Sequence, residues 1–207
     1  MALNMSLEEL NAMYVDVFRE IGNIGAGNAT TALAQLMGDK VDMSVPTVSL
    51  LDFKDVGSFI GGEEQVMVGI LLGVDGDITG SIMFLLEQQS AKHLVSKIMM
   101  GMDTPGEGFG EMELSALNEV GNIITGAYLN ALSGLTNLCI YPTPPALTVD
   151  MAGAILSVPA IQFGIQGDQI LMIQNQFFDE VEMDGYFILV PDMESYSTIL
   201  KALGLSM

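Results

Sequence analysis

Apolar side chains recur at steps of three and four residues over two long stretches of the chain. In the first stretch these positions are Leu10, Met13, Val17, Ile21 and Ile24. This spacing is the period of one buried helix face, and Ser6 with Glu9 forms a capping-box pattern at its start. The pattern predicts a helix over residues 6–38 and a second one over residues 111–135.

Shorter apolar and β-branched runs bounded by turn residues predict strands. Residues 41–53 suit an edge strand because they contain Pro46. The runs 66–72 and 80–86 flank a turn-rich connection and predict a hairpin. The other predicted strands are residues 146–156, 160–165, 169–174 and 186–190, and the other predicted helices are residues 88–100 and 193–203. This order predicts an α+β fold with a mixed or mainly antiparallel β-sheet, against which two long helices pack.

The two long helices carry the same residue pattern, 99 positions apart. The anchors are Asp16, Glu20, Asn23 and Pro46 in the first copy and Ser115, Glu119, Asn122 and Pro145 in the second. The pairs Gly22/Gly121, Ile24/Ile123, Gly27/Gly126, Ala32/Ala131, Leu33/Leu132 and Leu36/Leu135 are also identical at this offset. We interpret the chain as a pseudo-two-fold internal duplication. Repeats of about residues 6–101 and 111–207, joined by residues 101–110, are expected to form a single domain spanning residues 1–207.

Charge and cysteine content exclude several classes of protein. Six basic and 26 acidic residues give a net charge of −20, which opposes binding to nucleic acid or anionic lipid, since both require Lys and Arg. Cys139 is the only cysteine, so an intramolecular disulfide is impossible. Residues 1–9 lack a secretory signal pattern, and the apolar window 146–165 is interrupted by polar residues and a proline. A cytoplasmic protein without membrane association is expected.

The repeated Glu and Asn are the strongest candidates for chemistry. At about 100° per residue, positions 16, 20 and 23 fall within roughly 60° of one another on a helix. Neither side chain is a good nucleophile, but a carboxylate can pair with Lys, and a carboxamide can both donate and accept hydrogen bonds to a water molecule. Positioning and electrostatics of this kind supply most of the catalysis in phosphoryl transfer. A solvated polar helix face is the alternative for either copy alone, and the duplication favours a functional site.

Several glycines lie beside these residues. They are Gly22, Gly25 and Gly27 in the first copy and Gly121 and Gly126 in the second. Each costs roughly 1 kcal/mol in a helix relative to Ala, so something must offset that cost. Either another helix crosses closely at these positions, or the backbone of a partner approaches this face.

The sequence predicts no metal or nucleotide site. His93 is the only histidine, and no second His or Cys stands at ligand spacing from it. Asp75 and Asp77 flank a glycine but lack the other ligands of a calcium loop, so a turn is expected there. The glycine-rich stretches lack the Gly-Lys-Ser/Thr of a phosphate-binding loop. We therefore expect the protein to have no cofactor of its own.

The segments DVFREIGNIGAGN at 16–28 and SALNEVGNIITG at 115–126 resemble the two signature helices of the CheC family of chemotaxis phosphatases. Both copies match the family spacing of Asp or Ser, Glu, Asn and Pro, and the resemblance covers nearly the whole chain. It implies dephosphorylation of a CheY-type response regulator at its aspartyl phosphate. It also implies that Glu20 and Glu119 pair with the regulator's lysine, while Asn23 and Asn122 hold the attacking water.

The resemblance implies further roles and partners. Asp16 and Ser115 would support docking, and Pro46 and Pro145 would fix where the chain enters the sheet. Mg²⁺ would belong to the regulator. Two motifs distinguish the chain from the shorter CheX group, which pairs as dimers, so a monomer is expected. The flagellar-switch relatives such as FliY have an additional N-terminal peptide and C-terminal domain, for which we expect no counterpart here. The alternative function is a regulatory binding protein that sequesters CheD, a receptor-modifying deamidase, with little catalytic role.

Overall fold

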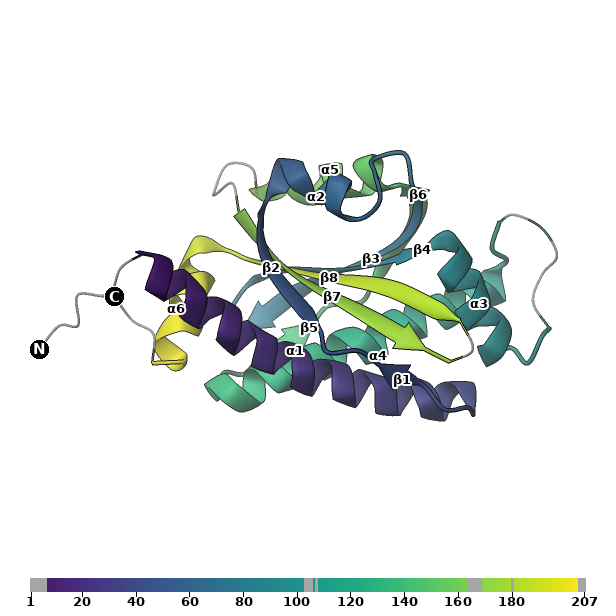
Figure 1. Cartoon of the computed structure of the whole chain (residues 1–207), viewed down its shortest axis with the longest axis horizontal. Helices are drawn as coiled ribbons and strands as arrows, with labels where there is room; N and C mark the ends of the chain where they lie inside the picture. Colours follow the sequence, from purple (N-terminus) through teal and green to yellow (C-terminus); the bar gives the residue numbers. More distant parts are fainter. Residues whose placement is uncertain (1–6, 103–105, 107, 164–168, 180, 205–207) are drawn as a thin grey trace, which may run out of the picture.

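Two long helices form one side of the molecule (Figure 1). The structure is a computed structural model that describes residues 7–102, 106, 108–163, 169–179 and 181–204. Helix α1 (Leu7–Met37) and helix α4 (Glu111–Thr136) agree with the predicted ranges, and the predicted cap Ser6 lies outside the described residues. The helices end at matched positions in left-handed residues, Gly38 with φ 65° and Asn137 with φ 57°. Both ends follow the usual αL termination of a helix.

An antiparallel sheet of eight strands lies beside these helices. The strands are β1 (Asp42–Met43), β2 (Thr47–Asp52), β3 (Val66–Gly76), β4 (Gly80–Glu87), β5 (Ile140–Pro142), β6 (Ala146–Met151), β7 (Gln169–Phe178) and β8 (Glu182–Pro191). Their order is β1-β7-β8-β4-β3-β5, with β2 also paired to β7 and β6 also paired to β3. The predicted α+β class with a mainly antiparallel sheet is confirmed.

The strands that follow the two long helices are exchanged between the halves of the chain. Strand β2 pairs with β7 and places Val48 opposite Ile173, while β6 pairs with β3 and places Leu147 opposite Ile70. Both edges therefore have the same register, with Val48 and Leu147 99 positions apart. At the centre of the sheet, Phe84 of β4 pairs with Phe187 of β8. The hairpins β3–β4 and β7–β8 have the same register at an offset of 103 residues, since Ile70 lies opposite Phe84 and Ile173 lies opposite Phe187.

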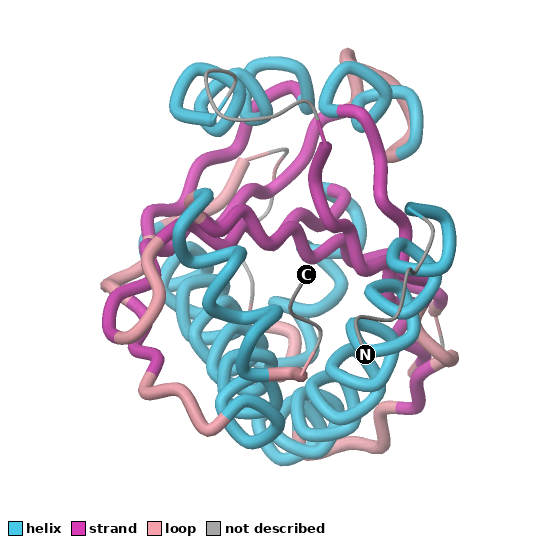
Figure 2. The backbone as a smooth tube through the Cα atoms, turned by 90° about the vertical axis from the view of Figure 1, so that its left-hand side faces the viewer, coloured by secondary structure: helices cyan, strands magenta, loops and turns pink. Residues whose placement is uncertain are grey.

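The sheet separates two layers of helices (Figures 1 and 2). Helices α1 and α4 cover one face, while α2 (Val56–Phe59) and α5 (Ala152–Phe163) cover the other. Side chains of β4 alternate between the two cores, as a strand period of two requires: Ile82 and Phe84 contribute to the core under α1 and α4, and Met83 and Leu85 to the core under α2 and α5. The closing helices α3 (Gln88–Ile98) and α6 (Met193–Ala202) follow β4 and β8.

Three differences from the predicted elements have physical reasons. Residues 152–156 and 160–163 were predicted as strand but form helix α5, whose buried Ala152, Ile155 and Leu156 follow helical spacing; short apolar runs do not distinguish the two structures. Residues 164–165 of the second run lie outside the described part. The predicted strand 41–53 is divided before Pro46 into β1 and β2, followed by a 3₁₀ turn at Phe53–Asp55. Elements α2 and β5 were not predicted, since one turn and three residues are too short for a periodic signal.

Candidate functional site

The predicted site residues of α1 and α4 lie on the outer face of the helix layer. Asp16, Glu20, Ser115, Glu119 and Asn122 are exposed, and Asn23 is half-buried. The two helices run in opposite directions (Figure 1) and meet where Gly25 faces Tyr128. Because Asn23 precedes Gly25 by two residues and Asn122 precedes Tyr128 by six, the two asparagines are about 12 Å apart along the helix axes at about 1.5 Å per residue. The structure therefore presents two separate Glu–Asn pairs on one surface.

The opposite side of each motif helix rests on the sheet through a repeated glycine. A Cβ atom at Gly22 would lie 3.4 Å from Ile173 Cγ2 and 3.4 Å from Pro46 Cβ. At Gly121 it would lie 2.7 Å from Ile70 Cγ2. These glycines allow close packing of helix on sheet directly before each asparagine. Pro46 is buried against α1 at this point, and Pro145 is half-buried at the matching position directly before β6.

A third glycine explains how the two helices contact each other. A Cβ atom at Gly25 would lie 2.8 Å from Tyr128 Cδ1 and 3.1 Å from Tyr128 Cα. The Tyr128 hydroxyl donates a 2.6 Å hydrogen bond to buried Asn175 Oδ1, and its ring stacks on Phe187 with centroids 4.1 Å apart. Burial raises the pKa of Tyr128 well above its usual value of 10.0. Helix crossing, one of the two predicted explanations, therefore accounts for Gly25.

The electrostatic surroundings of the two glutamates differ. In the first copy Arg19, the residue before Glu20 in the sequence, forms an exposed ion pair with Asp16, in which Nη1 lies 2.5 Å from Oδ1. The matching residues of the second copy are Asn118 and Ser115, which carry no charge. Across the part of the chain that the structure describes, Glu20 and Glu119 form no ion pair, so both carboxylates are available to a partner's cation.

Arg19, Asn118 and Tyr128 were not singled out from the sequence. The 99-residue offset contained the signal, because it pairs Arg19 with Asn118 and Ala29 with Tyr128. Asn118 Oδ1 is buried and accepts no hydrogen bond from any described residue. All three residues stand at positions where the two copies of the pattern differ.

The other candidate ligands have structural roles. His93 Nε2 lies 2.8 Å from Asp179 Oδ2, whose side chain is only 1% exposed, and Lys97 Nζ lies 3.7 Å from the same oxygen. Asp77 accepts a 2.8 Å hydrogen bond from the Cys139 N–H and so joins the β3–β4 connection to the residue before β5. Within the described ranges, no three His, Cys, Asp or Glu side chains are grouped to hold a metal ion. In the same ranges, no helix has the length and apolar character needed to cross a membrane.

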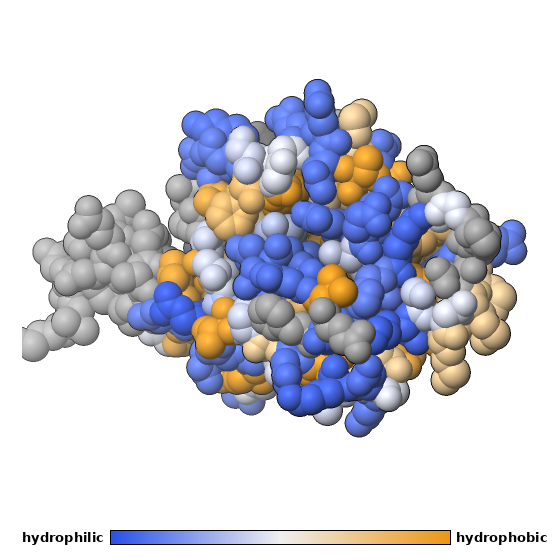
Figure 3. All heavy atoms as spheres, turned by 45° about the vertical axis from the view of Figure 1, so that its right-hand side comes forward, coloured by the Kyte–Doolittle hydropathy of each residue, from blue (hydrophilic) through white to orange (hydrophobic). Residues whose placement is uncertain are grey.

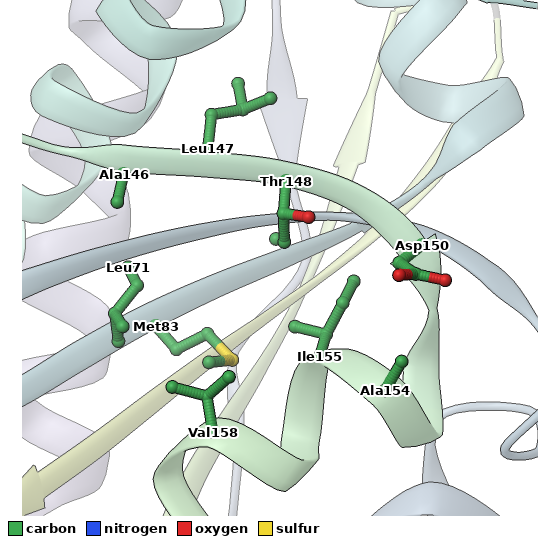
Figure 4. Close-up of a pocket in the computed structure, with 10 residues that line it drawn as sticks. Leu71, Met83, Ala146, Leu147, Thr148, Asp150, Ala154, Ile155 and Val158 are labelled. Carbon is green, nitrogen blue, oxygen red and sulfur yellow. The ribbon is translucent and has the colours of Figure 1, made fainter.

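A cavity of about 350 Å³ lies on the other face of the sheet, between α5, β6 and the strands β3 and β4. Figure 4 shows Met83, Ile155 and Val158 converging on it. None of its lining residues belongs to α1 or α4. The Glu–Asn pairs are thus on an open helical surface rather than in a pocket of the kind that encloses small ligands. The face of the molecule in Figure 3 shows hydrophilic residues interspersed with hydrophobic patches.

Comparisons with known proteins identify the family and the fold of the chain. The CheC-like family matches residues 15–50 and 112–149, which contain both Glu–Asn pairs and both prolines. The chain is 36% identical over 198 residues to the CheY-P phosphatase CheC of Bacillus subtilis, covering 93% of this chain and 95% of that protein. FliY of Thermotoga maritima has the same fold, with a TM-score of 0.73, 21% identity and coverage of 99% of this chain and 100% of that one. A CheX–CheY–BeF₃–Mg²⁺ complex from Borrelia burgdorferi also matches, with a TM-score of 0.52, 20% identity and coverage of 81% and 96%. The chain belongs to the CheC family.

Proposed function

We propose that this protein is a cytoplasmic phosphatase that hydrolyses the aspartyl phosphate of a CheY-type response regulator. The observation that carries the proposal is the presence of the same Glu–Asn pair on the outer face of both long helices, with only Asn23 half-buried and with the backs of the helices packed on the sheet at Gly22 and Gly121. The Bacillus subtilis relative, a CheY-P phosphatase by name, supports it.

Each pair supplies two interactions to the docked regulator. Glu20 or Glu119 accepts hydrogen bonds from the ammonium group of the regulator's active-site lysine, which positions the phosphorylated loop against the helix. Asn23 or Asn122 accepts a hydrogen bond from a water molecule through its carbonyl oxygen and orients it through its amide N–H. The water oxygen forms a bond to phosphorus as the bond to the aspartyl oxygen breaks. The products are inorganic phosphate and a free aspartate carboxylate on the regulator.

The remaining motif residues support this geometry. Asp16 and Ser115 are exposed one turn before each glutamate and contribute to docking. Pro46 holds α1 from behind, where it packs against Gly22, and Pro145 takes the matching position before β6. Mg²⁺ is expected on the regulator, and the Borrelia CheX–CheY complex contains Mg²⁺. Association with CheD and a monomeric state stay predictions of the family resemblance.

The decay of a phosphorylated CheY-type receiver domain in the presence of Mg²⁺ tests the proposal. The wild-type protein should accelerate release of phosphate. The double variant Glu20→Gln/Glu119→Gln keeps the side-chain shape but removes the charge that pairs with lysine, so kcat/KM should fall by about 10²-fold. Glu64→Gln, at an exposed position in the connection between α2 and β3 and outside both motif helices, is the matched control and should leave the rate unchanged. A wild-type protein that does not accelerate the decay would overturn the proposal.

A further inference from the structure

Two repeated glycines of the motif helices have no packing contact. A Cβ atom at Gly27 or at Gly126 would meet no heavy atom within 4 Å. In contrast, a Cβ atom at Gly22, Gly25 or Gly121 would lie within 3.4 Å of a neighbouring residue. Close approach of helix or sheet therefore explains three of the five motif glycines and leaves Gly27 and Gly126 unexplained.

Both glycines lower the stability of the helix in which they lie. Each lies inside a long helix, where Gly is roughly 1 kcal/mol less favourable than Ala. An alanine methyl group would fit at either position without a clash. Glycine at both positions thus reduces helix stability without any gain in packing, which points to a requirement outside the folded chain.

The position of the glycines relative to the asparagines identifies that requirement. Gly27 follows Asn23 by four residues, and Gly126 follows Asn122 by four, so each lies one turn further along the same helix face. Side chains on a helix lean toward its N-terminus and cover the turn before their own Cα atom. A side chain at residue 27 or 126 would therefore extend over the neighbouring asparagine.

We propose that Gly27 and Gly126 are positioning residues that leave the asparagine amides uncovered, so that the regulator's phosphorylated loop can approach the helix backbone. This inference rests on the proposed phosphatase function. The bare turn beyond each asparagine admits the phosphoryl group and its water within hydrogen-bonding reach of the amide. Substitution there moves the docked loop away from the helix while the fold is kept.

The test measures activity and thermal stability on single-site proteins. Asn122→Ala leaves only the first site, and Gly27→Ala or Gly27→Leu is added to it; Asn23→Ala leaves only the second, and Gly126→Ala or Gly126→Leu is added. Gly134→Ala is the matched control, because Gly134 is also exposed in α4 with no atom near its Cβ position and its counterpart in the first copy is Gln35.

All three alanine variants should raise the Tm, by roughly 2–4 °C if the full helix-propensity gain is realised. Only those at 27 and 126 should lose activity, with kcat/KM for the phosphorylated receiver lower by about tenfold for Ala and lower still for Leu. Higher stability with lower activity is a combination that a purely structural glycine would not give. Unchanged kcat/KM in the Gly27 and Gly126 variants would overturn the inference. Failure of the parent single-site proteins and the wild type to accelerate decay would instead overturn the phosphatase function itself.

Discussion

The site positions of the two long helices and the positions where these helices cross differ in how well they are repeated. On the outer face, Glu20 and Asn23 recur as Glu119 and Asn122, and the uncovered Gly27 recurs as Gly126. On the inner face, Gly25, Ala26 and Ala29 of α1 correspond to Ile124, Thr125 and Tyr128 of α4, and all six residues are buried. The Glu, Asn and Gly positions of the proposed site are therefore identical in both copies, whereas the residues at the crossing of the two helices are not.

This difference has a simple physical reason. Where two helices pack against each other, only the sum of the volumes must fit, so a small residue on α1 can accommodate a large one on α4, as Gly25 accommodates the Tyr128 ring. A partner that docks separately on each helix needs the same contacting residues on both helices. We infer that the repeated Glu, Asn and Gly positions are constrained by binding and the residues at the helix crossing by packing.

The largest effect is expected from separating the halves. We propose that the chain folds as one domain, because β2 pairs with β7 and β6 pairs with β3, so that each half needs an edge strand from the other. Residues 1–101 and 111–207, expressed separately, should each lack a cooperative unfolding transition, and mixing them should restore one. Circular dichroism during urea titration measures this. Cooperative unfolding of either fragment alone would contradict the proposal.

Alanine substitutions at Gly25 and Gly27 of α1 compare the stability effect of a buried position with that of an exposed one. Gly25→Ala should destabilise the protein by about 1–3 kcal/mol, since its methyl group would lie 2.8 Å from the Tyr128 ring and 3.1 Å from Tyr128 Cα. Gly27→Ala should have the opposite sign, because its methyl group meets no atom. Urea midpoints of the two variants provide the measurement. Equal changes in the free energy of unfolding for the two variants would contradict the close packing of α1 on α4 at Gly25.

The outer faces should differ most at Arg19. Its guanidinium pairs with Asp16, one turn before Glu20, and adds positive charge near the place where the partner's lysine would dock, whereas the second copy has the neutral Asn118 at this position. In an Asn122→Ala protein, Arg19→Asn should raise kcat/KM of the first site by about two- to threefold at low salt, the size expected for an exposed charge pair. The gain should shrink as salt is added, since exposed charges are screened. A gain that does not depend on salt would argue against this electrostatic cause.

The smallest effect concerns the helices that close each half. Asp192 Oδ1 caps α6 by accepting a 2.7 Å hydrogen bond from the Ser195 N–H, whereas Glu87 at the start of α3 makes no side-chain cap. Asp192→Ala should therefore cost about 1 kcal/mol of stability at pH 7, and Glu87→Ala should cost less. Differential scanning calorimetry of both variants measures the comparison.

The pH dependence of the Asp192 contribution follows from its hydrogen bonds. The Thr79 hydroxyl, and next the Ser195 N–H, donate to the carboxylate and lower the pKa of Asp192 below its ordinary value of 3.8. Because the folded pKa is the lower one, the stabilisation is complete above the ordinary value and is lost as the pH falls through the folded pKa. The Asp192→Ala protein and the wild type should thus converge in stability in strong acid. A constant difference between them down to pH 2 would contradict the role of the ionised carboxylate.

Long periodic elements were predictable from the sequence, and short or uniformly apolar ones were not. The helices α1 and α4 follow a clear helical period, and the hairpin β3–β4 consists of two apolar runs around a turn-rich connection; all were predicted within a few residues. Helix α5 was mistaken for strands because its sequence AGAILSVPAIQF is apolar on nearly every side, which removes the periodic signal. The exchange of β2 and β6 between the halves depends on long-range pairing, which no local pattern records.

The candidate site was predictable to a different extent. Glu20, Asn23, Glu119 and Asn122 were identified from their spacing, and the structure places them on one exposed surface. The separate roles of the glycines could not be assigned, because one residue type serves helix-on-sheet contact at Gly22, helix crossing at Gly25 and an uncovered surface at Gly27. The three roles can be told apart only from the atoms that surround each glycine in the folded protein.

The central claim is that the two asparagines act in phosphate hydrolysis, and the dephosphorylation rate of a phosphorylated CheY-type receiver with Mg²⁺ tests it most directly. The wild type, Asn23→Ala, Asn122→Ala and the double variant should be compared, with binding to the receiver measured in parallel. We predict that each single variant keeps the activity of its intact helix and that the double variant loses the acceleration while it still binds. A double variant that accelerates hydrolysis as well as the wild type would contradict the account.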